Sequence, residues 1–254
     1  MVYFIGAGPG DIELITVKGC NTLSTADCII YAGSLINHEL LGYAKNGCEL
    51  YDSAKMTLEE IIEMMLSNEE RGLITARLHT GDPSLYGAIK EQIDILVENG
   101  VAYEVIPGVS SFAGAAAVLG AEYTLPGVSQ TVILTRMEGR TPVPQKERIS
   151  ELAKIQASMA IFLSCSMLPE LSAALIDGGY PKGTPAAIVY KATWPDEKII
   201  KTTIEGLPEA GNTHNISKTA IILVGNFLGE QYERSLLYHP EFTHGYRTGQ
   251  SNNE

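Results

Sequence analysis

The first residues that could serve a ligand form a glycine-rich loop, Gly-Ala-Gly-Pro-Gly-Asp at residues 6–11, directly after the apolar run at 2–5. Glycines let a ligand approach the backbone closely, as in dinucleotide-binding loops. That fingerprint needs glycine at its sixth place, where Asp11 would repel a pyrophosphate, and Pro9 lacks an N–H for a phosphate. The loop therefore suits a ligand that is not a polyanion. The alternative is a tight strand-to-helix turn in which Asp11 is only a cap.

Two further loops could carry chemistry: Gly-Asp-Pro-Ser at residues 81–84 and Pro-Gly-Val-Ser-Ser at residues 107–111. Both follow predicted strands, and ligands of doubly wound sheets collect at the carboxyl ends of the strands. Asp82 followed by Pro83 also fits a helix N-cap and first turn, which is the simpler interpretation of Asp82. Asp11 and Asp82 together favour a positively charged ligand, whereas the two serines fit either helix caps or hydroxyl donors.

The sequence lacks the motifs of several other chemistries. It has no GxSxG elbow, Walker A loop or HExxH pair, and its five histidines are not spaced as metal ligands, so we expect no metal. His79, beside the second loop, is expected to be structural. The four cysteines form no CxxC pair, and reduced thiols fit a cytoplasmic protein. Without a protein nucleophile or a metal, an enzyme must work by positioning and electrostatics. Methyl transfer from a sulfonium is one such reaction.

Length and charge narrow the class of protein. A chain of 254 residues suffices for one large or two modest domains. No apolar run approaches the roughly 18 residues of a membrane span, and the N-terminus has no secretory signal, so we expect no membrane partner. The net charge of −12 disfavours a nucleic-acid partner, although a local basic cleft is compatible with it.

The elements that must position these loops follow from the alternation of apolar runs and helical patterns. Strands are expected at 2–5, 28–32, 49–51, 73–79 and 102–106, and helices at 16–26, 57–70, 85–98 and 110–119. This alternation predicts a mostly parallel, doubly wound sheet. After a pause, a mixed sheet is expected from strands at 130–135, 159–164, 186–193, 198–203 and 220–224, with a helix at 168–176. The strands at 186–193 and 198–203 flank a turn at 194–196, which predicts an antiparallel hairpin.

The predicted fold class is therefore α/β, with two α/β domains. The boundaries are residues 1–122 for the N-terminal domain, 123–232 for the C-terminal domain and 233–254 for a peripheral tail.

The motifs together resemble those of the tetrapyrrole methylases. The likeness rests on the loop at 6–11 with Leu-Ile-Thr-Val-Lys-Gly at 14–19, and on the loops at 81–83 and 107–111. It implies a homodimer that binds S-adenosylmethionine between two α/β domains, with the active site in that cleft. Two more specific stretches, 136–144 and 190–198, resemble the members that methylate carbon C(11) of precorrin-4 or cobalt-precorrin-4 in cobalamin biosynthesis. The match runs from residue 2 to about residue 229.

Carried over position by position, the resemblance implies contacts with the cofactor in both domains. In the N-terminal domain these are Pro9, Gly81, Asp82, Leu85, Tyr86, Ser110 and Ser111. In the C-terminal domain they are Phe162, Leu163, Ala192, Thr219 and Ala220, each to within about one position. The substrate, a tetrapyrrole with many carboxylates, requires cations, which the two specific stretches supply as Arg136, Arg140 and Lys191. The same three residues also fit solvated surface charge.

The absence of a nucleophile motif predicts direct displacement by an enamine-like ring carbon, with no covalent enzyme intermediate. A carboxylate or hydroxyl assists proton loss, but no residue of the sequence identifies itself as this base. The alternatives are a methylase of another ring position, a relative that modifies protein or ribosomal RNA, and a non-catalytic tetrapyrrole-binding protein. The net charge disfavours RNA, and Asp11 disfavours a nucleotide-dependent oxidoreductase. General resemblance favours the cobalt-containing substrate, although no residue reports the presence of cobalt.

Overall fold

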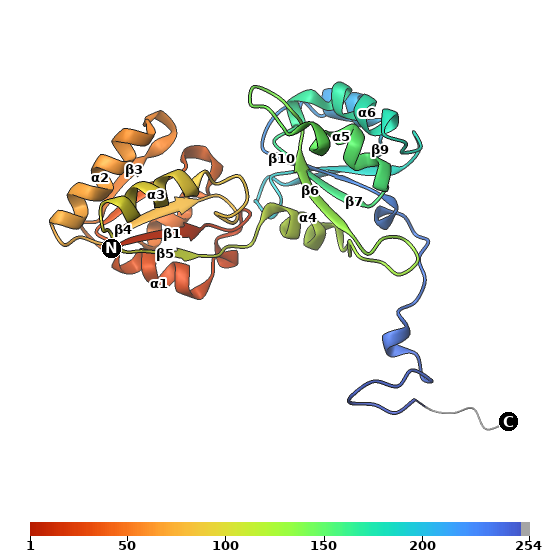
Figure 1. The fold of residues 1–254 in the computed structure, drawn as a ribbon, viewed down its shortest axis with the longest axis horizontal. Coiled ribbons are helices and arrows are strands. Elements are labelled where there is room, and N and C mark those ends of the chain that lie inside the picture. The colour runs from red at the N-terminus through yellow and green to blue at the C-terminus, as the bar shows by residue number, and fades with distance from the viewer. Residues whose placement is uncertain (250–254) are drawn as a thin grey trace. The chain divides into compact units, whose positions relative to one another are not determined.

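The computed structural model describes residues 1–249, which form two compact units (Figure 1). Unit 1 contains Met1–Val118 together with Lys191–Lys198, and unit 2 contains Leu119–Tyr190 and the residues from Ile199 on. The return of the chain to unit 1 at Lys191–Lys198 was not expected from the sequence. The last part of the predicted tail, residues 250–254, lies outside the described residues.

Unit 1 is built on a five-stranded sheet in the order β3-β2-β4-β1-β5, in which every neighbouring pair is parallel. Its strands are β1 (Val2–Gly6), β2 (Cys28–Tyr31), β3 (Glu49–Asp52), β4 (Thr75–His79) and β5 (Tyr103–Ile106). Because β1 lies between β4 and β5, the loops after these three strands leave the same edge of the sheet side by side. They are the three loops that the sequence singled out.

The helices of unit 1 are α1 (Val17–Thr25), α2 (Leu58–Glu70), α3 (Ile89–Glu98) and α4 (Ser111–Leu119), with short 3-10 turns at Ile12–Leu14, Gly33–Leu35, His38–Tyr43 and Ser53–Lys55. Two of them begin at a side-chain cap, at the residues where the sequence predicts the helices to start. The Thr16 hydroxyl accepts the N–H of Gly19, and Thr57 and Glu60 form a complete capping box at the start of α2. These caps satisfy N–H groups that the first helical turn leaves without partners.

The sheet of unit 1 is covered on both faces, as the alternation of side chains along β1 requires. Ile5 packs with Leu23 of α1 on one face, and its neighbour Phe4 packs with Met65 of α2 on the other, where α3 also lies. All four side chains are fully buried. This two-sided burial holds the sheet rigidly beneath the loops at its carboxyl edge.

Unit 2 contains a mixed sheet in the order β6-β7-β10-β8-β9. Its strands are β6 (Val132–Arg136), β7 (Ser158–Phe162), β8 (Pro185–Tyr190), β9 (Lys198–Thr203) and β10 (Ala220–Val224). β6 and β7 are parallel, whereas β10 runs antiparallel to both β7 and β8. The helices α5 (Ile149–Leu152), α6 (Leu168–Asp177) and α7 (Leu207–Thr213) share one apolar core with this sheet. The prediction of a parallel first sheet and a mixed second sheet is confirmed.

The remaining short elements of unit 2 are 3-10 turns at Gln145–Glu147, Ala153–Ile155, Cys165–Met167, Asn226–Leu228 and Leu236–Tyr238. Across residues 1–249, no helix has both the length and the apolar character that a membrane crossing requires.

Two predicted boundaries are wrong for the same physical reason. The helix expected at 85–98 begins only at Ile89, because Tyr86 and Ala88 have φ angles of 57° and 49°. The strand expected at 186–193 ends at Tyr190, because Lys191 and Thr193 have φ angles of 47° and 69°. Left-handed backbone fits neither a right-handed helix nor a strand, and side chains other than glycine seldom adopt it.

Candidate functional site

The loops that follow β1 and β4 in unit 1 are joined through their backbones. Gly8 donates its N–H to the Gly81 carbonyl over 3.2 Å, and Gly81 returns a hydrogen bond to the Gly8 carbonyl over 2.9 Å. Ala7 also donates to the carbonyl of His79 over 2.7 Å. The two loops are therefore joined by an antiparallel bridge just beyond the ends of their parallel strands.

Close packing of the loop at 107–111 against the other two loops requires two glycines. A Cβ on Gly6 would lie 2.5 Å from the Cα of Gly108, and a Cβ on Gly108 would overlap the carbonyl oxygen of Gly81. No side chain fits in either place, because the obstructing atoms belong to the backbone. Glycine is thus needed here for contact between loops, a requirement that is independent of any ligand.

Asp82 ties the second loop to the third. Its Oδ1 accepts the N–H of Ser84 over 2.9 Å and also the Ser84 hydroxyl, while its Oδ2 accepts the N–H of Gly108 over 2.8 Å. The prediction that Asp82 is a helix N-cap is wrong, since the following helix starts seven residues later at Ile89. Partial burial raises the pKa of Asp82, but these hydrogen bonds outweigh it and hold the pKa below its ordinary value. Asp82 is therefore an anion at neutral pH.

The polar groups of the loop at 6–11 are largely occupied by protein partners. Asp11 donates its N–H to the Thr193 hydroxyl over 3.0 Å, the N–H groups of Ala7 and Gly8 bond to the β4 loop, and Pro9 has none. The Asp11 carboxylate accepts the N–H of Glu13 over 2.9 Å and caps the 3-10 turn at Ile12–Leu14. This loop offers few donors to a phosphate group, which agrees with the argument from sequence against a dinucleotide.

The other predicted cofactor contacts of unit 1 follow β4 and β5 at the same edge of the sheet. Leu85 donates its N–H to the Asp82 carbonyl over 3.2 Å, and Tyr86, next in the chain, is about half exposed. Ser110 is buried, and Ser111 is the first residue of α4. These residues therefore share the edge at which Pro9 and Gly81 lie.

The predicted residues of unit 2 lie at one edge of its sheet. Arg136 and Phe162 end the parallel strands β6 and β7 and are paired in register. Ala220 begins β10 and pairs with Tyr190, the last residue of β8. Because β10 is antiparallel to both of its neighbours, its start lies where they end, so Leu163 and Thr219, which adjoin these strands, share that edge.

Backbone strain is concentrated at the predicted site residues. Eight non-glycine residues among 1–249 have a positive φ, and four of them are predicted site residues: Tyr86, Leu163, Lys191 and Thr219. Each such conformation costs on the order of 1–3 kcal/mol and persists where the surrounding structure determines it, which is common at ligand sites. The other four are Ala88, Gln156, Thr193 and Asn215.

The three predicted substrate cations have different environments. The Arg136 guanidinium donates to the carbonyls of Met137, Thr141 and Pro142 over 3.1, 3.3 and 2.9 Å, so it braces the loop at 137–142. Arg140, within that loop, is exposed. Lys191 belongs to unit 1, where its ammonium group lies 2.6 Å from Asp196 and 5.0 Å from the centre of the Trp194 ring.

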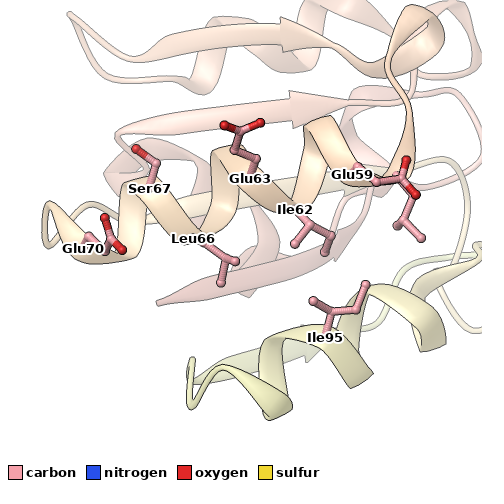
Figure 2. A pocket seen from close by; sticks show the side chains of 8 residues that line it. Glu59, Ile62, Glu63, Leu66, Ser67, Glu70 and Ile95 are labelled. Carbon is pink, nitrogen blue, oxygen red and sulfur yellow. The ribbon is translucent and has the colours of Figure 1, made fainter.

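A separate groove lies between α2 and α3. Figure 2 shows Ile62 and Leu66 of α2 pointing toward Ile95 of α3, with carboxylates of α2 around them. The full lining is Leu58, Glu59, Ile62, Glu63, Leu66, Ser67, Glu70 and Ile95. None of these is a predicted site residue. Within residues 1–249 no group of three or more His, Cys, Asp or Glu side chains is placed to hold a metal ion.

Sequence reasoning missed three residues that shape these edges. Trp194 donates its indole N–H to the Pro9 carbonyl over 2.9 Å, and Asn37 donates to the Gly10 carbonyl over 3.0 Å. In unit 2 the fully buried Ser164 accepts the N–H of Met137 over 2.8 Å. Only Trp194 could have been found from the sequence, because it is the single tryptophan and lies in the stretch at 190–198.

Comparison with known proteins gives a consistent result. Residues 1–208 match the profile of the Tetrapyrrole (Corrin/Porphyrin) Methylases. The chain is 54% identical over 247 residues to the cobalt-precorrin-4 C(11)-methyltransferase of Methanocaldococcus jannaschii, covering 97% of this chain and 95% of that one. It is 44% identical over 250 residues to the precorrin-4 C(11)-methyltransferase of Pseudomonas aeruginosa, covering 98% and 99%.

A solved structure extends the likeness to three dimensions. The X-ray structure of a cobalt precorrin-4 methyltransferase superposes with a TM-score of 0.88 at 48% identity, covering 90% of this chain and 96% of the other.

Proposed function

Because the chain belongs to the tetrapyrrole methylase family, we propose that it transfers the methyl group of S-adenosylmethionine to carbon C(11) of cobalt-precorrin-4 in cobalamin biosynthesis. The observation that carries this proposal is the 54% identity to the Methanocaldococcus enzyme over 97% of the chain, which includes both units. We prefer the cobalt-containing substrate to the metal-free one because the sequence identity is lower, at 44%, to the Pseudomonas enzyme named for metal-free precorrin-4.

The residues at the carboxyl edge of unit 1 suit S-adenosylmethionine, which the methylases of this family use. When bound, it supplies a methyl group on a positively charged sulfur with a neutral thioether as leaving group. Pro9, Gly81, Asp82 and Ser110 would contact it from this side. The fit rests on two features of that edge: Asp82 is anionic, and the loop at 6–11 has few N–H groups to offer a polyanion.

Cations of the stretches at 136–144 and 190–198 would bind the carboxylates of the tetrapyrrole. Arg136 holds the loop from which Arg140 extends, and Lys191 is kept in place by Asp196. The chain as a whole carries a net charge of −12, so these cations act locally and not through the overall field.

We also propose that the methyl group passes directly to the ring carbon. Burial raises the pKa of the Cys28 and Cys165 thiols to about 11, so neither is a thiolate at neutral pH. A single turnover with labelled donor should leave no label on the protein. Label retained on a side chain and then passed to the product would contradict direct transfer.

The test of this function is an assay with both candidate substrates. The purified chain is incubated with labelled S-adenosylmethionine and either cobalt-precorrin-4 or precorrin-4, and product masses are measured. We expect a gain of one methyl group, faster with the cobalt form. Binding of the tetrapyrrole without methyl transfer would support a non-catalytic binding protein instead.

Two further expectations are also proposals, the first drawn from the family likeness and the second from the unpaired cysteines. They are a homodimer, which sedimentation equilibrium of the purified chain tests, and a cytoplasmic location, which cell fractionation tests.

A further inference from the structure

We propose that Trp194 and Thr193 are positioning residues that fix the loop at 6–11 in the shape the cofactor needs. They belong to the eight-residue segment Lys191–Lys198, here called the clasp, which follows β8 and ends at the first residue of β9 but is part of unit 1. The inference rests on the proposed function, because it assigns a role to residues that would not touch the cofactor themselves.

Two adjacent clasp residues hold three consecutive residues of the loop. The Trp194 indole N–H donates to the Pro9 carbonyl over 2.9 Å, and the Thr193 hydroxyl accepts the Asp11 N–H over 3.0 Å. Between these bonds Gly10 lies directly against the indole, since a Cβ there would overlap the ring. The orientations of both peptides that flank Gly10 are thereby set by the clasp.

A third element confines Pro9 from another side. A Cβ on Gly114 of α4 would come within 2.9 Å of the Pro9 Cβ and 3.5 Å of the Thr193 methyl carbon. Glycine at position 114 thus lets α4 pack directly on Pro9 and Thr193. The backbone of Pro9, a predicted contact of the cofactor, is held between α4 and the clasp.

The clasp is braced more firmly than a connection between two strands requires. Trp194 donates its N–H to the Lys191 carbonyl over 3.0 Å, and Thr193 donates its N–H to the Glu197 carboxylate over 2.5 Å. The Lys191 ammonium binds Asp196 over 2.6 Å. These bonds hold Lys191 and Thr193 in left-handed conformations that a simple turn would avoid. The strained shape is what aims the indole N–H and the Thr193 hydroxyl at the loop.

The matched test changes one hydroxyl. Thr193→Val removes the acceptor of the Asp11 N–H with little change of shape, and Thr193→Ser restores it. Losing one such hydrogen bond should weaken binding of S-adenosylhomocysteine, measured by calorimetry, about five- to tenfold, with recovery in the serine variant. Trp194→Phe, which keeps an aromatic ring but loses the indole N–H, should weaken binding to a similar extent. The KM for the tetrapyrrole should stay within about twofold of wild type in all three variants.

The single tryptophan gives a second readout in the unmodified protein. Since Trp194 is the only tryptophan, its emission reports on the clasp alone. Adding S-adenosylhomocysteine should change that emission and reduce quenching by acrylamide, because a cofactor bound against the loop shields the neighbouring half-buried indole from solvent.

The outcomes separate this inference from the function on which it rests. If wild-type protein binds S-adenosylhomocysteine but Thr193→Val binds it equally well and the emission does not respond, the positioning role is rejected. If wild-type protein gives no heat of binding, the proposed function is rejected and the inference falls with it.

Discussion

The Asp82 carboxylate accepts the backbone N–H of Gly108 over 2.8 Å across 26 positions of sequence. This bond joins the loop after β4 to the loop after β5, two strands that lie on either side of β1. With the backbone bridge between Gly8 and Gly81, it makes one connected structure of three loops. These bonds hold the edge of the first sheet in one arrangement, which reduces the entropy lost when a ligand binds.

Asp82→Asn should weaken this structure, because an amide has only one oxygen for the two N–H groups that Asp82 accepts. Leaving one of them unpaired should lower the free energy of unfolding by about 1–3 kcal/mol in urea titrations. Ser84→Ala is the matched control, since it removes only the Ser84 hydroxyl, and it should cost less than about 1 kcal/mol. Equal losses in the two variants would contradict the role of the bond to Gly108.

Gly108→Ala should be far more damaging than its size suggests. The new methyl group would overlap the Gly81 carbonyl and come within 3 Å of Gly6, so the loops must separate. We expect a loss of about 1–3 kcal/mol or more in unfolding free energy, with loss of S-adenosylhomocysteine binding. At Gly42 a Cβ would have nothing within 4 Å, so Gly42→Ala should be neutral or slightly stabilising. Full binding by Gly108→Ala would contradict the packing argument.

His79 should make stability depend on pH. Burial, and secondarily the charge of Arg77, lower its pKa from 6.5 to about 3, so the folded protein keeps His79 neutral while the unfolded chain takes up a proton below pH 6.5. The stability from this difference is complete above pH 6.5 and is lost as pH falls toward 3, by about 1.4 kcal/mol per pH unit.

A matched variant isolates the contribution of His79 from that of other groups. His79→Gln does not titrate, so between about pH 7 and pH 5 its unfolding free energy should fall less steeply with decreasing pH than that of wild type. Identical slopes would show that His79 is not held neutral in the folded protein.

Much of the fold could be predicted because the local signals agree with the tertiary structure. The Thr16 cap, the capping box of Thr57 with Glu60 and the order of strands and helices all follow from sequence patterns of a few residues. The edge that carries the three loops follows as well, since parallel strands place their carboxyl ends together.

What could not be predicted depends on contacts that are distant in sequence. The start of α3 at Ile89 and the end of β8 at Tyr190 are set by left-handed residues without glycine, which no local propensity indicates. Asp82 looked like a helix cap because Pro83 follows it, yet its partner Gly108 lies in another loop. The clasp was missed because its hydrogen bonds to Pro9 and Asp11 span more than 180 positions of sequence.

Arg136 and Arg140 should affect substrate binding in different ways. Arg136→Lys keeps the charge but cannot reproduce the three bonds to the loop at 137–142, so it should raise the KM for the tetrapyrrole about tenfold and lower stability by about 1 kcal/mol. Arg140→Ala should raise the KM without changing the unfolding free energy, because Arg140 is exposed. Both should leave the Kd for S-adenosylhomocysteine unchanged. An unaltered KM in both variants would show that these arginines do not bind the substrate.

The most direct test of the account is the position of the transferred methyl group. Cobalt-precorrin-4 is incubated with the full chain and S-adenosylmethionine labelled with carbon-13 in its methyl group, and the product is examined by nuclear magnetic resonance. We predict one labelled methyl group, attached to C(11). A label at any other ring carbon, or an unlabelled tetrapyrrole after prolonged incubation, would contradict the proposed function.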